Sequence, residues 1–147
     1  MIEPSAGDRL LDAWLNLTSV LWNTRIVSSM TYNEAHVLGI LHRCPADTSM
    51  TATDLICRTH LLKSQMNKLL TSLEAKGYIL RCRSSQDRRM IDIAITPAGR
   101  AAYLEEHKGV EAILNQLIAV IGEEKAASVT DGINEVSQAL ESILAGR

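Results

Sequence analysis

The sequence predicts a mainly α-helical fold with a small β-hairpin wing: a winged helix-turn-helix unit flanked by N- and C-terminal dimerisation helices. Three observations predict this fold. Apolar residues recur at helical spacing along most of the 147 residues. Two short segments with strand character follow each other between residues 78 and 95. The basic residues gather in the same region. The length suits a single domain, residues 1–147, with the winged helix-turn-helix at about 31–97 and the dimerisation helices at about 8–29 and 98–146.

The first two helices are predicted from apolar spacing and from a capping motif. Over Leu10 to Val27, four apolar residues share one helical face: Leu10, Trp14, Leu17 and Leu21. Thr31 and Glu34 then form a capping box that opens the next helix. That helix should bury Val37, Leu38 and Leu41, and it should end at Cys44 because Pro45 disfavours helix in the residue before it.

The next two helices form the predicted helix-turn-helix. Thr51 to Asp54 repeats the capping pattern and opens a short helix, and a tight link follows near His60. A regular helix is expected over Leu61 to Lys76, with Gly77 as its left-handed end. Its buried stripe is predicted as Leu62, Met66, Leu69 and Leu73, and its polar side as Ser64, Gln65, Asn67, Lys68, Thr71 and Ser72.

A hairpin and two long helices complete the chain. Strands are expected at Tyr78 to Arg83 and at Met90 to Ile95, where isoleucines alternate with Asp92 and Ala94, and Ser84 to Arg89 forms the polar tip. Thr96 and Pro97 cap and start a long helix that Gly122 interrupts before the last one. The apolar stripes of these helices are spaced by three and four residues, and one subunit has little chain left to cover them. We therefore expect dimerisation through Leu114, Leu117, Ile133, Val136, Leu140 and Ile143, with a monomeric bundle as the alternative.

Charge is distributed unevenly along the chain. Residues 58–100 hold nine basic and three acidic residues, a net +6, whereas the remainder holds six basic and 14 acidic residues, a net −8. The total of −2 conceals this polarisation. A basic segment in an otherwise acidic chain predicts a face that meets a polyanion, the alternative being a solvated basic face without a partner.

Composition excludes several classes of protein. No uncharged apolar run approaches the ~18 residues of a membrane span, and Met1 to Leu10 lack the pattern of a secretory signal. The cysteines Cys44, Cys57 and Cys82 offer neither a disulfide framework nor a zinc ribbon, and Cys44 and Cys57 are expected to pack as small residues. Catalytic and phosphate-loop motifs are missing, which argues against an enzyme. These features predict a cytoplasmic protein without a membrane partner, a cofactor or a resident metal.

The combination of a polar-faced helix and a basic hairpin tip predicts binding to double-stranded DNA. The helix can present donors and acceptors to base edges in the major groove, and arginines at the tip suit the minor groove. Asp87 is expected to hold one of the tip arginines in place. The predicted DNA-contacting residues are Lys63, Ser64, Gln65, Asn67, Lys68, Thr71, Ser72, Arg83, Arg88 and Arg89. A helical interaction module without DNA binding is the alternative, which salt-dependent duplex binding would distinguish.

Three motifs resemble those of the MarR family of bacterial transcription regulators. They are Leu73-Glu74-Ala75-Lys76-Gly77-Tyr78-Ile79 at a helix end, Asp87-Arg88-Arg89 in the wing and Ile95-Thr96-Pro97-Ala98-Gly99 at a helix entry. The resemblance covers nearly the whole chain. It implies a homodimeric winged-helix repressor on a pseudo-palindromic operator, often released by a small ligand, with Leu61 to Lys76 as recognition helix and Arg88 and Arg89 in the wing.

The resemblance also bears on the signal. The reactive cysteine of peroxide-sensing members is missing from Leu10 to Val27, and Glu111 replaces one histidine of the zinc-sensing branch. His36, Glu106 and His107 nevertheless occupy comparable places, so a zinc-responsive regulator of the same fold stays an alternative. We expect a small organic effector instead, bound near Trp14, Met30, Tyr32, His36 and His107.

Overall fold

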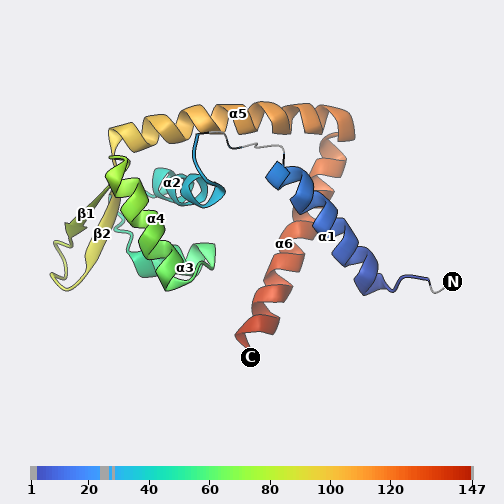
Figure 1. The fold of residues 1–147 in the computed structure, drawn as a ribbon, viewed down its shortest axis with the longest axis horizontal. Coiled ribbons are helices and arrows are strands. Elements are labelled where there is room, and N and C mark those ends of the chain that lie inside the picture. The colour runs from blue at the N-terminus through green and yellow to red at the C-terminus, as the bar shows by residue number, and fades with distance from the viewer. Residues whose placement is uncertain (1–2, 24–26, 28, 147) are drawn as a thin grey trace. The chain divides into compact units, whose positions relative to one another are not determined.

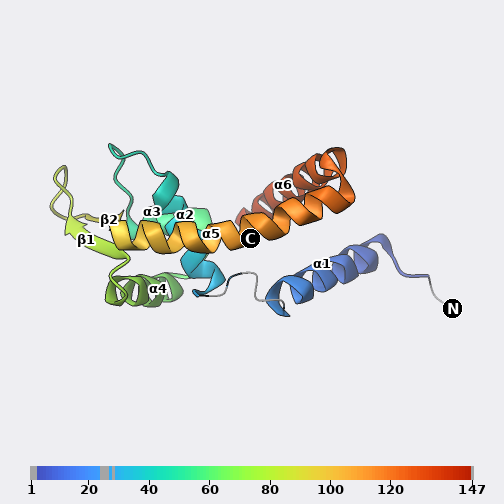
Figure 2. The same ribbon diagram turned by 90° about the horizontal axis from the view of Figure 1, so that it is seen from above.

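The computed structural model describes residues 3–23, 27 and 29–146, which form six helices and a two-stranded antiparallel sheet (Figures 1 and 2). The elements are α1 (Ala6–Asn23), α2 (Tyr32–Arg43), α3 (Ala52–Thr59), α4 (Lys63–Ala75), β1 (Ile79–Arg83), β2 (Ile91–Ile95), α5 (Pro97–Ile121) and α6 (Glu123–Ala145). This order confirms the predicted fold class. Over the described part of the chain, no helix is both long and apolar enough to cross a membrane.

The chain divides into two compact units, Met1–Gly109 and Val110–Arg147. The first unit contains α1, the winged helix-turn-helix and the beginning of α5. The second contains the rest of α5 and all of α6. In the second unit the predicted stripe residues are exposed by 36% to 59%. These are Leu114, Leu117, Ile133, Val136, Leu140 and Ile143.

Helix α1 begins earlier than the sequence predicted. The Ser5 hydroxyl accepts a hydrogen bond from the Asp8 backbone N–H, and the Asp8 carboxylate accepts one from the Ser5 N–H, at 3.1 and 2.9 Å. This reciprocal cap starts the helix at Ala6 instead of Leu10. The predicted helix extended to Val27, but residues 24–26 lie outside the described part of the chain.

Both predicted capping boxes of the helix-turn-helix are confirmed. Thr31 and Glu34 exchange hydrogen bonds at the start of α2, and Thr51 and Asp54 do the same at the start of α3. Helix α2 ends at Arg43 because Cys44 is extended, as Pro45 requires. Helix α3 ends where His60 adopts a left-handed conformation with φ of 57°.

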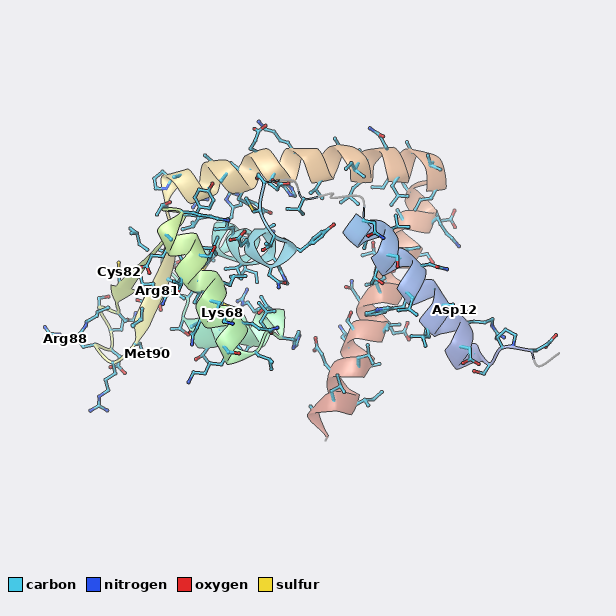
Figure 3. The ribbon with its side chains drawn as sticks, viewed as in Figure 1. Asp12, Lys68, Arg81, Cys82, Arg88 and Met90 are labelled. Carbon is cyan, nitrogen blue, oxygen red and sulfur yellow. The ribbon has the colours of Figure 1, made fainter. Side chains whose placement is uncertain are left out.

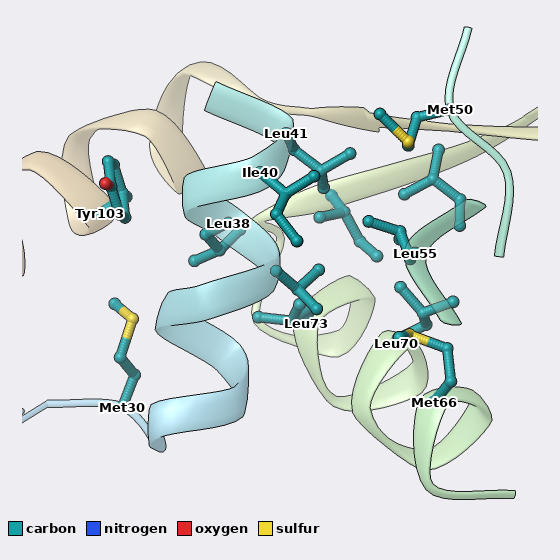
Figure 4. Close-up of a cluster of buried hydrophobic side chains, with 13 residues drawn as sticks. Met30, Leu38, Ile40, Leu41, Met50, Leu55, Met66, Leu70, Leu73 and Tyr103 are labelled. Carbon is teal, nitrogen blue, oxygen red and sulfur yellow. The ribbon is translucent and has the colours of Figure 1, made fainter. Parts of the chain in front are cut away.

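The hydrophobic core lies between α2, α3, α4, the hairpin and the start of α5 (Figure 4). The prediction that Val37, Leu38 and Leu41 are buried is confirmed. The predicted stripe of α4 was partly wrong. Leu62 is 67% exposed, Leu69 is only half-buried, and Leu70 takes the buried place between Met66 and Leu73. Leu62 fails to join because it is the N-cap, where the extended backbone directs its side chain off the helical surface.

Strands β1 and β2 pair from Ile79 opposite Ile95 to Arg83 opposite Ile91. Ile93 is buried, whereas Ile91 is 53% exposed because it lies at the tip end of the hairpin, beyond the reach of the core. The structure adds a pairing that the sequence did not predict. The Met50 carbonyl accepts a hydrogen bond of 2.7 Å from the Ile93 N–H, which ties the start of α3 to the wing.

The cap of α5 fastens the base of the hairpin. The Thr96 hydroxyl accepts from the Gly99 N–H and donates to the Gly77 carbonyl, and the Thr96 N–H donates to the Tyr78 carbonyl. Gly99 is required here, since a Cβ at this position would lie 2.1 Å from the Tyr78 carbonyl oxygen. The predicted turns at Gly77 and Gly122 are confirmed by φ values of 73° and 87°.

The cysteines are all free thiols. Cys44 is half-buried and packs against the core, as expected, and its thiol lies 3.6 Å from the Thr48 carbonyl. The expectation that Cys57 is packed was wrong, because it occupies the exposed side of α3.

Candidate nucleic-acid interface

The exposed face of α4 carries most of the polar residues that the sequence singled out. Ser64, Asn67 and Lys68 are exposed, and Lys68 is marked on α4 in Figure 3. Gln65 is exposed too, but its amide oxygen accepts a hydrogen bond of 2.9 Å from the Leu62 N–H and so caps the helix. This face combines a cation with amide and hydroxyl groups, the side chains that hydrogen-bond to base edges.

Ser72 does not belong to the outward face. Its side chain is half-buried, and its hydroxyl donates a hydrogen bond of 2.9 Å to the Glu34 carboxylate of α2. The sequence placed it among the DNA-contacting residues because helical spacing alone cannot locate the edge of the packed side. In the folded protein Ser72 joins α4 to α2.

The wing tip is held by its own backbone and by Asp87. The Asp87 carbonyl accepts from the Met90 N–H, and one of its carboxylate oxygens accepts from the Arg89 N–H, both at 2.9 Å. The expectation that Asp87 holds an arginine was therefore correct only for the backbone of Arg89. No ion pair joins Asp87 to either tip guanidinium within the described residues, so both guanidinium groups stay available at the tip, where Figure 3 marks Arg88.

Arg81 is a site residue that the sequence analysis missed. It lies opposite Ile93, on the face of the hairpin that meets the core. From there its guanidinium donates a hydrogen bond of 3.2 Å to the Thr71 hydroxyl, and its Nε lies 3.5 Å from the Glu74 carboxylate. Arg81 thus connects the wing to α4, and only the strand register, not its position in the sequence, assigns it this role.

A surface cleft brings two predicted cations together. Lys63 from the start of α4 and Arg89 from the wing both line it. The remaining lining residues come from the start of α3 and from β2 and its approach: Thr51, Ala52, Thr53, Asp54, Met90 and Ile91. A chain of phosphates that passes the start of α3 would meet both cations.

The cations of this surface are not neutralised by the protein. Lys63, Lys68, Arg83, Arg88 and Arg89 are all exposed, and in the described ranges no carboxylate lies within ion-pair distance of any of them. Lys76 and Arg81 differ from this group because each is paired with a glutamate. Five unpaired cations on α4 and the wing form a surface suited to a polyanion.

Beneath α4 lies a buried carboxylate. Glu34 is only 4% exposed. One of its carboxylate oxygens accepts two hydrogen bonds, of 2.8 Å from the Lys76 ammonium and of 2.9 Å from the Ser72 hydroxyl. The other oxygen accepts from the Thr31 N–H and from Lys76, at 2.9 and 3.0 Å. Burial raises the pKa of Glu34, but the hydrogen bonds from Lys76, Thr31 and Ser72 and the charge of Lys76 outweigh it, so the pKa lies below its ordinary value.

The residues of the predicted effector site have diverse environments. Met30 is buried in the core, Tyr32 is half-buried and donates to the Leu21 carbonyl, and Trp14 is 53% exposed. His107 is exposed and stacks on Tyr103 with ring centroids 5.4 Å apart. Partial burial, and then the charge of Arg43, lower the pKa of His36.

Potential metal ligands near this region have other roles. The buried Glu106 carboxylate accepts hydrogen bonds from the backbone and hydroxyl of Ser29. In the portion of the chain described by the structure, no three His, Cys, Asp or Glu side chains gather closely enough to hold a metal ion.

Known proteins resemble this chain in sequence and in fold. Residues 28–90 match the model of the MarR family. The homoprotocatechuate degradative operon repressor of Escherichia coli is 28% identical over 107 residues, which cover 73% of this chain and 70% of the repressor.

Two solved structures share the fold. MepR of Staphylococcus aureus in its complex with DNA superposes with a TM-score of 0.75 at 19% identity, over 88% of this chain and 97% of MepR. BpsR of Bordetella bronchiseptica, whose DNA binding is regulated by 6-hydroxynicotinic acid, superposes with a TM-score of 0.72 at 18% identity, over 93% of this chain and 96% of BpsR.

Proposed function

We propose that this chain, whose residues 28–90 match the MarR family, is a winged helix-turn-helix regulator that represses transcription by binding an operator in double-stranded DNA as a homodimer. Helix α4 reads bases in the major groove, and the wing places Arg88 and Arg89 beside the adjacent minor groove. The E. coli relative is an operon repressor and MepR has been solved with DNA, which supports this assignment.

One observation carries the proposal. Five exposed cations without carboxylate partners in the described residues occupy α4 and the wing, while the chain as a whole carries a net charge of −2. A surface helix that only contacts solvent gives no reason for basic and acidic residues to be separated in this way. In a protein that binds DNA through one face the separation is expected, because acidic residues elsewhere oppose binding in other orientations.

The homodimer rests on the apolar stripes of the C-terminal helices. Six aliphatic residues predicted for the interface are each more than a third exposed in the single chain. Exposed apolar surface of this extent is unusual for a monomer and typical of a subunit interface. A twofold-symmetric dimer presents two copies of α4 to successive major grooves, about 10 bp apart.

The regulatory signal is proposed to be a small organic ligand. BpsR, which shares the fold, is regulated by an organic acid. The residues proposed to contact the ligand, Trp14, Met30, Tyr32, His36 and His107, offer the mixture of apolar and polar side chains that lines most ligand sites. A preference of 1–3 kcal/mol for the non-binding spacing of the recognition helices would suffice for release.

Two variants and a matched control test DNA binding. An operator is first selected in vitro from random duplexes, and affinity for it is measured against salt. Lys68→Ala should weaken operator binding more than random binding, by about 1–3 kcal/mol if Lys68 contacts a base. Arg88→Ala should weaken binding to the operator and to random duplexes alike, and it should lower the slope of log affinity against log salt concentration by about one. The control Lys108→Ala removes an exposed lysine of α5 that pairs with Glu105, and it should change neither quantity. Unchanged affinity and slope in both interface variants would refute the proposal.

A further inference from the structure

A single buried carboxylate connects the start of α2 with the end of α4. Glu34 closes its own capping box through the Thr31 N–H, for which one oxygen suffices. Its carboxylate also binds Ser72 and Lys76, residues 38 and 42 positions further along the chain. A cap alone does not require these contacts, so the distal half of the network needs its own explanation.

Ser72 and Lys76 are placed so that they fix the orientation of α4. Ser72 lies in the last turn of α4 and Lys76 is its C-cap, four residues later, so both lie on the same side of the helix. Helices α2 and α4 also contact each other, and Leu38 of α2 and Leu73 of α4 belong to the same buried apolar cluster. Apolar packing is non-directional, whereas hydrogen bonds depend on distance and angle. The carboxylate thus supplies the directional restraint on this side of α4.

A small rotation of α4 would be enough to disturb base recognition. Side-chain ends lie about 5–6 Å from the helix axis, so a rotation of about 20° moves them by about 2 Å. A hydrogen bond tolerates a range of only about 0.5 Å in donor–acceptor distance. Binding to phosphates is less affected, because it depends on charge more than on direction.

On this basis we infer that Glu34 is a positioning residue for operator recognition: through Ser72 and Lys76 it holds α4 at the rotation that lets its outward face read bases. The inference rests on the proposed function. The low pKa of Glu34 agrees with a carboxylate that stays charged in this place. Lys76 accordingly stabilises the packing of α4 against α2 and does not bind a DNA phosphate, although it lies in the basic segment.

Glu34→Gln is the principal test, because glutamine preserves the cap while it removes the charge that binds Lys76. The measured quantity is the specificity ratio, the dissociation constant for random duplex divided by that for the selected operator. We expect the ratio to fall about tenfold, as for the loss of a hydrogen bond to a charged group. Ser72→Ala should lower it less, and Lys76→Met should lower it without changing the salt slope.

Three comparisons separate positioning from simple loss of stability. Lys76→Arg keeps the cation and should therefore keep the specificity ratio near its wild-type value, unlike Lys76→Met. The double variant Glu34→Gln/Lys76→Met should lower the ratio no more than either single variant, because both remove the same restraint. Lys108→Met, which breaks the exposed pair with Glu105, should leave the ratio at its wild-type value. Thermal unfolding identifies the variants that are folded at the assay temperature.

The outcomes are distinct. If the wild-type protein selects no operator, the proposed function fails. If it does select one and folded Glu34→Gln discriminates equally well, only the positioning role is refuted. A salt slope lowered by about one in Lys76→Met would assign Lys76 to a phosphate and would also overturn the inference.

Discussion

Replacement of Gly99 by alanine tests how the wing is joined to α5. Gly99 is the third residue of α5, and a Cβ there would lie 2.1 Å from the Tyr78 carbonyl oxygen, 2.8 Å from its carbon and 2.9 Å from its Cα. All three are backbone atoms, so no side chain can rotate to make room. The Tyr78 N–H and carbonyl are also held by Leu73 and Thr96. The hairpin base and α5 must therefore separate.

The magnitude follows from the size of the clash. Contact at 3.0 Å is the lower limit for real Cβ atoms, so the 2.1 Å contact calls for a displacement of about 0.9 Å. Overpacking of this kind costs typically 1–3 kcal/mol and occasionally more. Alanine recovers at most about 1 kcal/mol through its higher helix propensity. A clash with fixed backbone atoms belongs at the upper end of that range, so the net loss should be about 2 kcal/mol, which lowers the melting temperature by about 4–8 °C for a chain of this size.

Gly109→Ala is a matched control in the same helix. A Cβ at Gly109 meets nothing within 4 Å, so the substitution should stabilise the protein by up to about 1 kcal/mol. Thermal unfolding of both variants is measured by circular dichroism at one protein concentration, because an oligomer's stability depends on concentration. If Gly99→Ala melts as high as Gly109→Ala, the close approach of α5 to the hairpin is not a real constraint.

Three further predictions concern assembly, pH and the signal. Replacing Leu140 and Ile143 with aspartate should give monomers by sedimentation and abolish operator binding; a monomer that binds with full affinity refutes the dimer. Hydrogen bonds from Thr51 lower the pKa of Asp54, and a net effect in the same direction acts on Glu34. Both carboxyls therefore stabilise the fold above their unfolded pKa values, and this stability is lost as pH falls below about 4; Asp54→Asn should flatten that loss in acid unfolding. Operator affinity should be unchanged by chelator or peroxide, whereas a tenfold change with micromolar zinc that His107→Ala removes would identify a metal sensor.

The boundaries of α2, α3 and α4 could be predicted because the interactions that determine them are local. The capping boxes of Thr31 and Thr51 each close within three residues, and Gly77 adopts positive φ for reasons of its own chemistry. Pro45 restricts only its immediate neighbour. The order of elements, the basic segment and the exposed polar face of α4 follow from such short-range patterns and from composition.

The roles of individual site residues depended on contacts between distant parts of the chain. Helical spacing placed Ser72 on the DNA-contacting side, but a carboxylate 38 positions away draws it to the packed side. Arg81 is assigned to α4 only by the strand register.

The sequence by itself therefore determined which segments form helices and strands and which segment carries positive charge, because these properties arise from interactions across three or four residues. Only the tertiary structure decided that Leu70 and not Leu62 is buried, and that Glu34 serves α4 as well as its own helix. The physical reason is that such contacts depend on how helices rotate and pack against one another. That rotation is fixed jointly by all the residues of the core, and no local pattern records it.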